Sequence, residues 1–500
     1  MRYIYKIILI LLNLIPLLYA QNVHTRYYEM DFKEFINELK RTPFNEMTPE
    51  QQRLWIESHA RVGDGHSIFT TFQKWFSNHP VADQKFTTAG ILFASLGQFQ
   101  IADEFLSTAV RINERNYDAF LARTSLLMYL RQFNEAEASF LKAEQICQDI
   151  KHTGLYRNIG YELYNALFEV NKKIAFLEKI RKVYQTNKKS EKIHKTEERI
   201  RLFMNFKNQR LFKTVVSSVR IEVPMIDFAP GVFYKCLVLR MNGKEYKILL
   251  DTGNAVGWTI HDSNLLELLN TQIGTKSEIA TGSVEKTLKS AEIITPSLKF
   301  DQFSVRNLSG YYFRKPRENY FDANLNPIFI RDYVVTMDFI HNKFILRTKQ
   351  QFEKDLEKDK EYICTKLPFY GYEWPFIPVQ INGYANALAM IETGAEDVIL
   401  RKEFAEWIHL PLLSRIKKWG EKEYLYNETK HSTIRFGIFQ LTREKMEVWP
   451  KRFYDHVTGL YYHVMIGPIA LEGKYIVSFD PFDNVIIFQK PVKKISATYN

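Results

Sequence analysis

A short pattern occurs twice in the second half of the chain. Residues 242–253 and residues 382–394 each begin with Asn-Gly, continue as an apolar stretch and end in an acidic residue followed by Thr-Gly. Asn-Gly between apolar stretches is typical of a tight β-hairpin turn, so each copy predicts a hairpin, a strand and a loop. The second copy has one extra residue in its strand. Two copies in matching context predict a mostly-β region built from two similar lobes.

The two copies also end alike. Residues 333–338 read Tyr-Val-Val-Thr-Met-Asp and residues 475–480 read Tyr-Ile-Val-Ser-Phe-Asp, and a further apolar run follows each of them. Runs this rich in β-branched and aromatic residues predict strands. A β-sandwich whose turns match by coincidence would leave the double repeat unexplained. We therefore predict one lobe at 214–350 and a second at 351–500.

Three segments carry a resemblance to a known family. Residues 249–253, Leu-Leu-Asp-Thr-Gly, resemble the catalytic loop of retropepsin-like and pepsin-like aspartic proteases, and residues 390–395 occupy the same place in the second lobe. Residues 465–467, Met-Ile-Gly, resemble the apolar-apolar-Gly motif that packs under this loop. In the first lobe that place falls near residues 325–327, where the Gly is missing. The resemblance extends over residues 217–490 and implies two protease lobes fused in one chain.

The resemblance implies that Asp251 and Glu392 are a catalytic pair that hydrolyses peptide bonds. Two carboxyl groups held side by side share one proton, because like charges in contact cannot both ionise cheaply. The ionised group would act as general base on a water, while the protonated group would polarise the scissile carbonyl. This chemistry requires neither a metal nor a cofactor, and we predict none. The expected substrate is a peptide or protein.

The same resemblance assigns supporting roles to five further residues. The Thr hydroxyls would bond across the lobes, and the Gly residues would let each loop turn tightly and donate N–H groups to the carboxylates. A hairpin near residue 282 would form a flap over the substrate. These residues are Thr252, Gly253, Thr393 and Gly394 for the loops and Gly282 for the flap.

Glu392 departs from the family pattern, because the second catalytic position is Glu instead of Asp. The side chain is one methylene longer, and catalysis is sensitive to displacements of that size. The extra residue in the preceding strand could be a β-bulge that shifts the loop and compensates. The alternative is a weak or inactive protease-like protein that uses its cleft and helices to hold peptides or partner proteins. A homodimer in which lobe one pairs with itself would not need Glu392 at all.

The first half of the chain predicts a helical repeat array over residues 21–213. Small and aromatic residues recur after 34 positions, with Gly90 and Phe93 placed to suit a first helix. This period resembles the tetratricopeptide repeat, in which small residues let two helices approach closely. A non-repeating helical bundle is the alternative, and an array of this kind usually binds a partner protein. The recurring residues are Ala102, Leu106 and Ala109, followed by Ala136, Phe140 and Ala143.

Residues 1–20 have the anatomy of a signal peptide. A positively charged start is followed by an apolar run and by Ala20 as a small residue for cleavage. The apolar run is interrupted by Asn13 and Pro16 and is short for a membrane-spanning helix, although an uncleaved anchor is the alternative. We predict export to the periplasm or the extracellular space, with a bacterial envelope as the favoured location. We also predict no transmembrane helix in the mature chain.

The net charge of +11 comes mainly from one segment. Residues 172–213 contain fourteen Lys and Arg but four Asp and Glu. Such a run usually forms a solvated helix face, and the chain has no nucleic-acid-binding signature, so we predict no nucleic-acid partner. Of the three cysteines, Cys236 and Cys364 could pair in an oxidising compartment, which would leave Cys147 free.

Overall fold

The structure is a computed structural model that describes residues 32–146, 154–229, 231–281, 284–313, 321–395, 397–419, 422–449, 460 and 462–492. The chain divides into two compact units. Of the described residues, the first unit contains 32–128, 132–146, 154–163 and 460. The second contains 129–131 and the remaining described residues from 164 onward. The predicted signal peptide and Cys147 lie outside the described residues.

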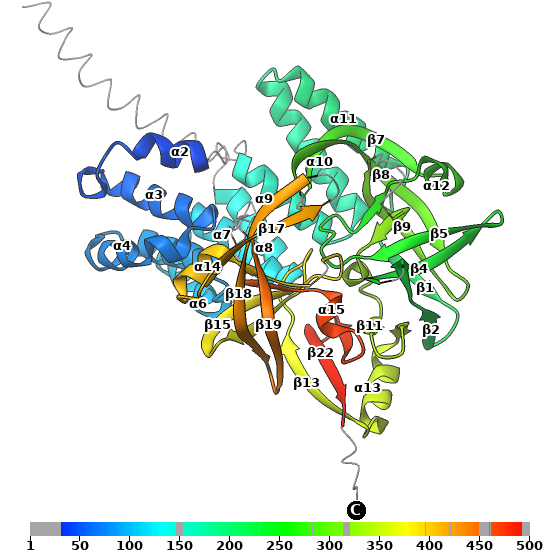
Figure 1. The fold of residues 1–500 in the computed structure, drawn as a ribbon. Helices are drawn as coiled ribbons and strands as arrows, with labels where there is room; N and C mark the ends of the chain where they lie inside the picture. The colour runs from blue at the N-terminus through cyan, green and yellow to red at the C-terminus, as the bar shows by residue number, and fades with distance from the viewer. Residues whose placement is uncertain are drawn as a thin grey trace, which may run out of the picture. The chain divides into compact units, whose positions relative to one another are not determined.

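The first unit is made of helices arranged as a repeat (Figure 1). The pair α5–α6 recurs as α7–α8, and α6 and α8 begin 34 residues apart, as the sequence period predicts. The helices described from residue 32 to this point are α2 (Phe32–Leu39), α3 (Pro49–Arg61), α4 (Gly65–Asn78), α5 (Ala82–Ser95), α6 (Phe99–Ile112), α7 (Tyr117–Tyr129), α8 (Phe133–Ile146) and α9 (Gly154–Ala166).

Small residues let the repeated helices approach closely. A Cβ atom added to Gly90 of α5 would lie 2.4 Å from Cγ of Leu106 on α6. Ala102, Ala109 and Ala136 are fully buried in the same array. The recurring small residues are therefore contact points between helices, and the predicted repeat array is confirmed.

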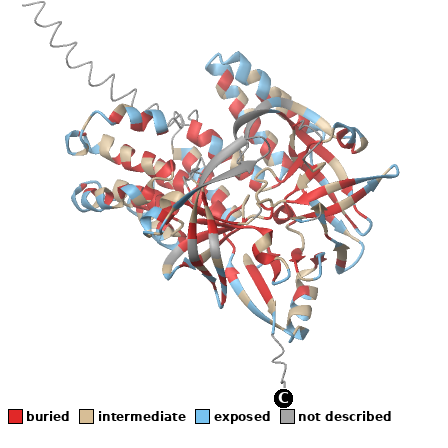
Figure 2. Ribbon diagram, viewed as in Figure 1, coloured by how far each residue is buried: buried red, intermediate tan, exposed pale blue. Residues whose placement is uncertain are grey.

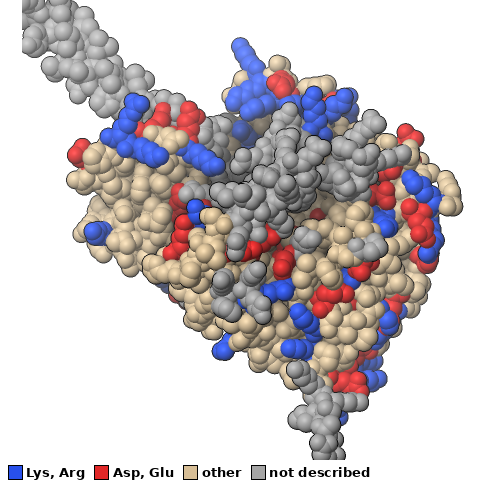
Figure 3. Space-filling model, in the orientation of Figure 1, with Lys and Arg blue, Asp and Glu red and all other residues tan. Residues whose placement is uncertain are grey.

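Two basic helices, α10 (Val170–Thr186) and α11 (Ser190–Met204), belong to the second unit and precede both lobes in the chain. They carry much of the basic segment, and Lys and Arg side chains gather at the top of the view in Figure 3, where Figure 1 shows α10 and α11. Not all of these cations face water, because Lys173 is only 5% exposed. The prediction of a solvated face is therefore wrong for this lysine.

The first lobe is a curled sheet in the order β3-β4-β5-β10-β6-β9-β8-β7, with β1 paired to β9. The turn between β4 and β5 is Asn242-Gly243 with both φ angles positive, as a two-residue hairpin requires. The described strands are β1 (Lys213–Val216), β3 (Ile226–Ala229), β4 (Val232–Met241), β5 (Lys244–Leu250), β6 (Trp258–Ile260), β7 (Gln272–Thr281), β8 (Val284–Lys299), β9 (Phe303–Tyr312) and β10 (Ala323–Leu325), with helix α12 (Ser263–Leu268) after β6.

The second lobe repeats this plan in the order β14-β15-β20-β16-β19-β18-β17. Its β14–β15 turn is Asn382-Gly383, again with positive φ at both residues. The described elements are β14 (Phe376–Ile381), β15 (Tyr384–Ile391), β16 (Val398–Arg401), β17 (Leu413–Trp419), β18 (Lys422–Phe436), β19 (Phe439–Trp449) and β20 (Val464–Ile466), with helices α14 (Lys402–Trp407) and α15 (Pro468–Leu471).

A third sheet joins the lobes in the order β13-β22-β21-β11-β12-β2. At its centre β11 and β21 run antiparallel, and Thr336 lies opposite its counterpart Ser478 with their hydroxyl oxygens 2.8 Å apart. Every residue of β11 and β21 is buried, which Figure 2 shows as red strands. The strands are β2 (Arg220–Pro224), β11 (Val334–Asp338), β12 (Lys343–Arg347), β13 (Tyr362–Pro368), β21 (Ile476–Asp480) and β22 (Val485–Pro491), with α13 (Lys349–Lys358) after β12.

These elements confirm the predicted fold class, a helical repeat array followed by a mostly-β, bilobal aspartic-protease fold. The possible disulfide is wrong, because Cys236 and Cys364 are both free. Cys236 is buried in β4 of the first lobe while Cys364 is exposed in β13 of the shared sheet. None of the described helices is both long and apolar enough to cross a membrane.

Candidate active site

Each lobe holds its acidic residue at the end of a central strand. In the first lobe β10 passes between β5 and β6, and the N–H of Asp251 donates to the carbonyl of Leu325 at 3.0 Å. In the second lobe β20 passes between β15 and β16, and the N–H of Glu392 donates to the carbonyl of Ile466 at 3.0 Å. The apolar motif of residues 465–467 therefore lies under the second loop, as predicted, and its counterpart under the first loop is 324–326, one residue earlier than the predicted 325–327.

The extra residue of the second copy is absorbed far from the loop. The pairing of β14 with β15 shifts register between Val379 and Ile381, close to the hairpin turn, whereas Phe376 faces Met390 in regular pairing. The bulge predicted in this strand therefore exists, but it does not move the loop to compensate for the longer Glu392. Regular pairing resumes before the strand reaches Glu392, so the bulge does not shift the backbone at this residue. The additional methylene of Glu392 therefore extends its carboxyl group further from the backbone than an Asp side chain would.

The two loops hold each other through a reciprocal exchange of hydrogen bonds. The N–H of Thr252 donates to Oγ1 of Thr393 at 3.0 Å, and the N–H of Thr393 donates to Oγ1 of Thr252 at 2.9 Å. Each hydroxyl then donates across the interface, from Thr252 to the carbonyl of Ile391 and from Thr393 to the carbonyl of Leu250, both at 2.6 Å. Both Thr residues are buried, at 0% and 1% exposure. The first lobe is thus paired with the second lobe of its own chain.

The Gly residues after the Thr pair make room for the acid of the opposite lobe. A Cβ atom on Gly253 would lie 1.6 Å from Oε2 of Glu392, and one on Gly394 would lie 2.5 Å from Oδ1 of Asp251. Each Gly N–H also donates to the acid of its own loop, at 3.0 Å from Gly253 to Asp251 and at 2.9 Å from Gly394 to Glu392. The longer side chain of Glu392 therefore reaches across the interface over Gly253.

The carboxyl groups of Asp251 and Glu392 are hydrogen-bonded to each other. Burial, followed by the negative charge of Asp251 and this hydrogen bond, raises the pKa of Glu392 well above its ordinary value. The N–H groups of Gly394 and Gly253 oppose the shift. The raised pKa favours the protonated form of Glu392.

An amide distinguishes the two acids. Nδ2 of Asn324 on β10 donates to Oδ2 of Asp251 at 2.9 Å. Its Oδ1 lies 3.3 Å from Nε2 of the buried His261, whose Nδ1 lies 3.4 Å from the carbonyl of Phe313. The residue in the same place on β20 is the apolar Met465, so this amide is present only in the first lobe. An extra N–H on Asp251 favours its charged form and leaves the proton to Glu392.

Two further residues fasten the first loop. Asn326 stands where the family pattern has Gly, and its Nδ2 donates to the carbonyls of Thr252 at 3.2 Å, Asn254 at 3.0 Å and Glu373 at 2.9 Å. Nε1 of Trp374 donates to the carbonyl of Gly253 at 2.9 Å. Asn324 and Trp374 were not among the residues predicted from the sequence, and Asn326 was noted only as part of the segment in which the family Gly is missing. Two Asn residues on either side of Leu325, where the second lobe has Met465 and Gly467, were the signal that could have identified the two Asn side chains.

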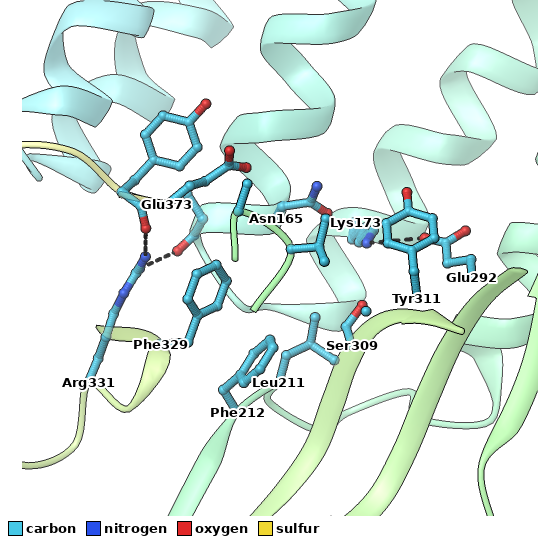
Figure 4. Close-up of a pocket in the computed structure, with 15 residues that line it drawn as sticks. Asn165, Lys173, Leu211, Phe212, Glu292, Ser309, Tyr311, Phe329, Arg331 and Glu373 are labelled. Atoms are coloured by element: carbon cyan, nitrogen blue, oxygen red, sulfur yellow. Dashed lines mark hydrogen bonds and ion pairs between the residues drawn. The ribbon is translucent and has the colours of Figure 1, made fainter. Parts of the chain in front are cut away.

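The flap and a neighbouring pocket complete the surroundings. Strands β7 and β8 pair up to Thr281 and Val284, but the predicted flap residue Gly282 lies outside the described residues. A small pocket of about 70 Å³ is lined in part by Ala255 and Val256, which follow the first loop. Figure 4 shows its polar side chains, which include Lys173 of α10 and Glu292 of β8.

Comparisons with known proteins give distant likenesses in fold. No family model and no curated protein matches the chain. An aspartic proteinase from Irpex lacteus is 10% identical with a TM-score of 0.37, covering 56% of this chain and 100% of its own. A retropepsin-like aspartic protease from Rickettsia conorii is 16% identical with a TM-score of 0.20, covering 26% of this chain and 92% of its own. Conglutin gamma, a basic 7S globulin from lupine seeds, is 11% identical with a TM-score of 0.32, covering 54% and 95%.

These likenesses are too distant to carry a function, which must rest on the geometry of the site. That geometry consists of two lobes, a shared sheet and two acid-Thr-Gly loops that exchange hydrogen bonds. It brings together Asp251, Glu392, Thr252, Thr393, Gly253 and Gly394, the six predicted residues of the two loops.

Proposed function

We propose that the chain is an exported aspartic endopeptidase in which Asp251 and Glu392 activate a water. The observation that carries this proposal is the direct hydrogen bond between the two carboxyl groups, held by reciprocal Thr contacts and by Gly N–H groups. Two loops that needed only structural contacts would not require two acids at contact distance. Burial of paired acids costs free energy, and catalysis gives a reason for retaining them.

The asymmetry of the pair supports a division of roles. The Asp251 carboxylate, held by Asn324, removes a proton from the water as the water oxygen adds to the scissile carbonyl carbon. Glu392 gives its proton to the carbonyl oxygen, which produces a neutral tetrahedral diol. In the second step Asp251 returns its proton to the amide nitrogen, Glu392 takes a proton from a diol hydroxyl, and the C–N bond breaks. The pair is then restored.

A peptide-library cleavage assay tests this proposal. Wild-type protein is expected to cleave a subset of peptides in the acidic range, and Asp251→Ala and Glu392→Gln are expected to abolish the same cleavages. If the Asp251→Ala variant kept full activity, the proposed catalytic role of Asp251 and Glu392 would be contradicted. Thermal unfolding of each variant must show that the fold persists.

Glu392 favours a second candidate, a protease-like protein that binds peptides with little or no hydrolysis. Its carboxyl oxygens lie over Gly253, within the space between the two loops. If Glu392→Asp creates cleavage that the wild type lacks, the natural protein belongs to this class. If Glu392→Asp lowers an existing activity, the longer side chain is the working one.

Export and partner binding belong to the same proposal. Residues 1–20 would direct the chain to the periplasm or beyond, and the helical array would hold a protein partner in the manner of tetratricopeptide repeats. Detection of a chain that begins near residue 21 in a periplasmic or secreted fraction would support export. Retention of the full-length chain in the membrane fraction would contradict it.

A further inference from the structure

The pocket beside the first catalytic loop contains a buried ammonium group. Lys173 is 5% exposed, and its Nζ lies 3.8 Å from the centre of the Phe203 ring. The carboxylate of Glu292 approaches it only to 3.9 Å, which is beyond hydrogen-bond distance. Within the described residues, no hydrogen bond from this ammonium group is present. A buried charge with open donors is costly unless a ligand supplies the acceptors.

The charged side chains that line this pocket are Lys173, Arg331, Glu292 and Glu373, and Arg199 adds a further cation beside Glu292. Glu292 is already held by Arg199, whose Nε donates to Oε2 of Glu292 at 2.9 Å. Two cations therefore share one carboxylate. Burial lowers the pKa of Lys173 to about 8, Glu292 opposes this change and Arg199 adds to it. The group remains mainly protonated at neutral pH, and an incoming anion would be stabilised by it.

A neutral donor lies beside this ammonium group. Tyr311 also lines the pocket, and burial raises its pKa to about 12, so the phenol keeps its proton. Its oxygen is hydrogen-bonded to Arg199, and its O–H remains available to a ligand as a donor. Figure 4 shows Tyr311, Lys173 and Glu292 grouped at one end of the pocket, with Phe212 and Leu211 along its lower side. Apolar contacts would suit the carbon chain of a ligand whose tip is anionic.

The pocket adjoins the segment that directly follows the first catalytic loop. Ala255 and Val256, four and five residues after Asp251, form part of its wall. On the other side Glu373 lines it, next to Trp374, which bonds to Gly253 of the loop. A peptide that lies along the first loop would therefore extend into this pocket.

We propose that the pocket is a recognition site for a carboxylate of the bound peptide, which Lys173 and Tyr311 hold. The proposal rests on the proposed peptide-binding function of the cleft and adds the chemical class of a substrate group. The carboxylate belongs either to an Asp or Glu side chain or to the chain terminus. Lys173 comes from a helix that precedes both lobes, so this recognition depends on α10 as well as on the protease-like lobes.

Binding to the full-length mature chain carrying Asp251→Asn tests the proposal without requiring turnover. The probes are fluorescent peptides amidated at the C-terminus, in which Glu is exchanged for Gln at successive positions, and a Glu-free peptide with a free C-terminal carboxylate. A Glu peptide binding about tenfold more tightly than its Gln partner is expected at one position if a side chain is held. A gain of that size from the free terminus identifies the terminal carboxylate.

Lys173→Met should abolish the preference while leaving the affinity for uncharged peptides unchanged. Lys172→Met removes the same charge from a neighbouring residue that is partly exposed and paired with Glu169, so it should keep the preference. Equal binding of every matched pair, or loss of preference in both variants, overturns the proposal. Binding with the expected preference but no cleavage by the wild type would keep this site and remove the proposed hydrolysis.

Discussion

Asn324 donates a hydrogen bond from Nδ2 to Oδ2 of Asp251 at 2.9 Å, and the second lobe has no counterpart of this bond. The equivalent position on β20 is Met465, which offers no donor to Glu392. The two acids are otherwise matched in backbone contacts, since each amide N–H bonds to the strand that passes beneath its loop. The Asn324 side chain therefore distinguishes Asp251, the acid that carries the negative charge, from Glu392, the acid that holds the proton.

Replacement of Asn324 by Met, the residue of the second lobe, should lower kcat by about tenfold or more. A hydrogen bond to a charged group is worth about 1.5–3 kcal/mol, and about 1.4 kcal/mol corresponds to a factor of ten. The acidic limb of the pH–rate profile should also move to higher pH, because the charged form of Asp251 loses a donor. Steady-state kinetics across pH would measure both changes. An unaltered profile would show that the amide does not set the charge distribution.

His261→Phe should produce a weaker change in the same direction. The imidazole faces Oδ1 of Asn324 and fixes which end of the amide points to Asp251. Without it the amide can rotate and present oxygen to the carboxylate. The expected result is a fall in kcat that is smaller than in Asn324→Met, with KM little changed. A fall in the double variant equal to that in Asn324→Met alone would show that His261 acts through the amide.

The thermal stability of the lobes should fall as pH rises through the raised pKa of Glu392. The folded protein holds this proton more tightly than the unfolded chain, so the stabilisation is complete below the ordinary pKa of Glu and is lost as the group ionises in the fold. Glu392→Gln copies the protonated acid and should flatten this part of the curve. Tm measured against pH for both proteins checks this. Parallel curves would contradict a raised pKa.

Thr252→Val should destabilise the lobes by about 2–4 kcal/mol, because the N–H of Thr393 and the carbonyl of Ile391 lose buried partners. Thr252→Ser keeps the hydroxyl and should cost much less. Chemical denaturation followed by a probe within the lobes would measure the difference. If Val and Ser variants are equally stable, the exchange between loops contributes no net stability.

Gly90→Ala should destabilise the helical array, although Ala favours a helix over Gly by about 1 kcal/mol. The new methyl group would meet Leu106 at 2.4 Å, and overpacking costs about 1–3 kcal/mol. Combining Gly90→Ala with Leu106→Ala should give a loss smaller than the sum of the two single losses, which a double-mutant cycle would measure. Additive losses would mean that the two residues are not in contact.

The duplicated pattern predicted the fold and the acidic pair because both depend on local sequence. Asn-Gly turns, apolar strands and acid-Thr-Gly loops each specify their own geometry, and their repetition implied that the halves meet. The matching strands 333–338 and 475–480 could be expected in each lobe. Their pairing with each other at the centre of a shared sheet is a long-range contact that no short pattern encodes.

The residues that were missed act over long sequence separations. Asn324 lies 73 positions from Asp251, and Trp374 lies 121 positions from Gly253. The sequence predicts that Lys173 is one of several cations on a solvated helix face. Only the packing of α10 against the first lobe shows that this lysine is buried. The bulge was expected from the extra residue, but its distance from the loop depends on where strand register recovers.

The shared sheet has a consequence for how the two halves can evolve. In a symmetric pair of identical chains every substitution appears twice, so a helpful Asn beside one acid would also appear beside the other. Here β11 and β21 keep the central pairing of such a pair within one covalent chain. Each half can then carry its own residues, and Asn324 stands where the other half has Met465, as Asp251 stands where it has Glu392. Because both halves lie in one chain, the two acids and their neighbours can differ, which identical chains would not allow.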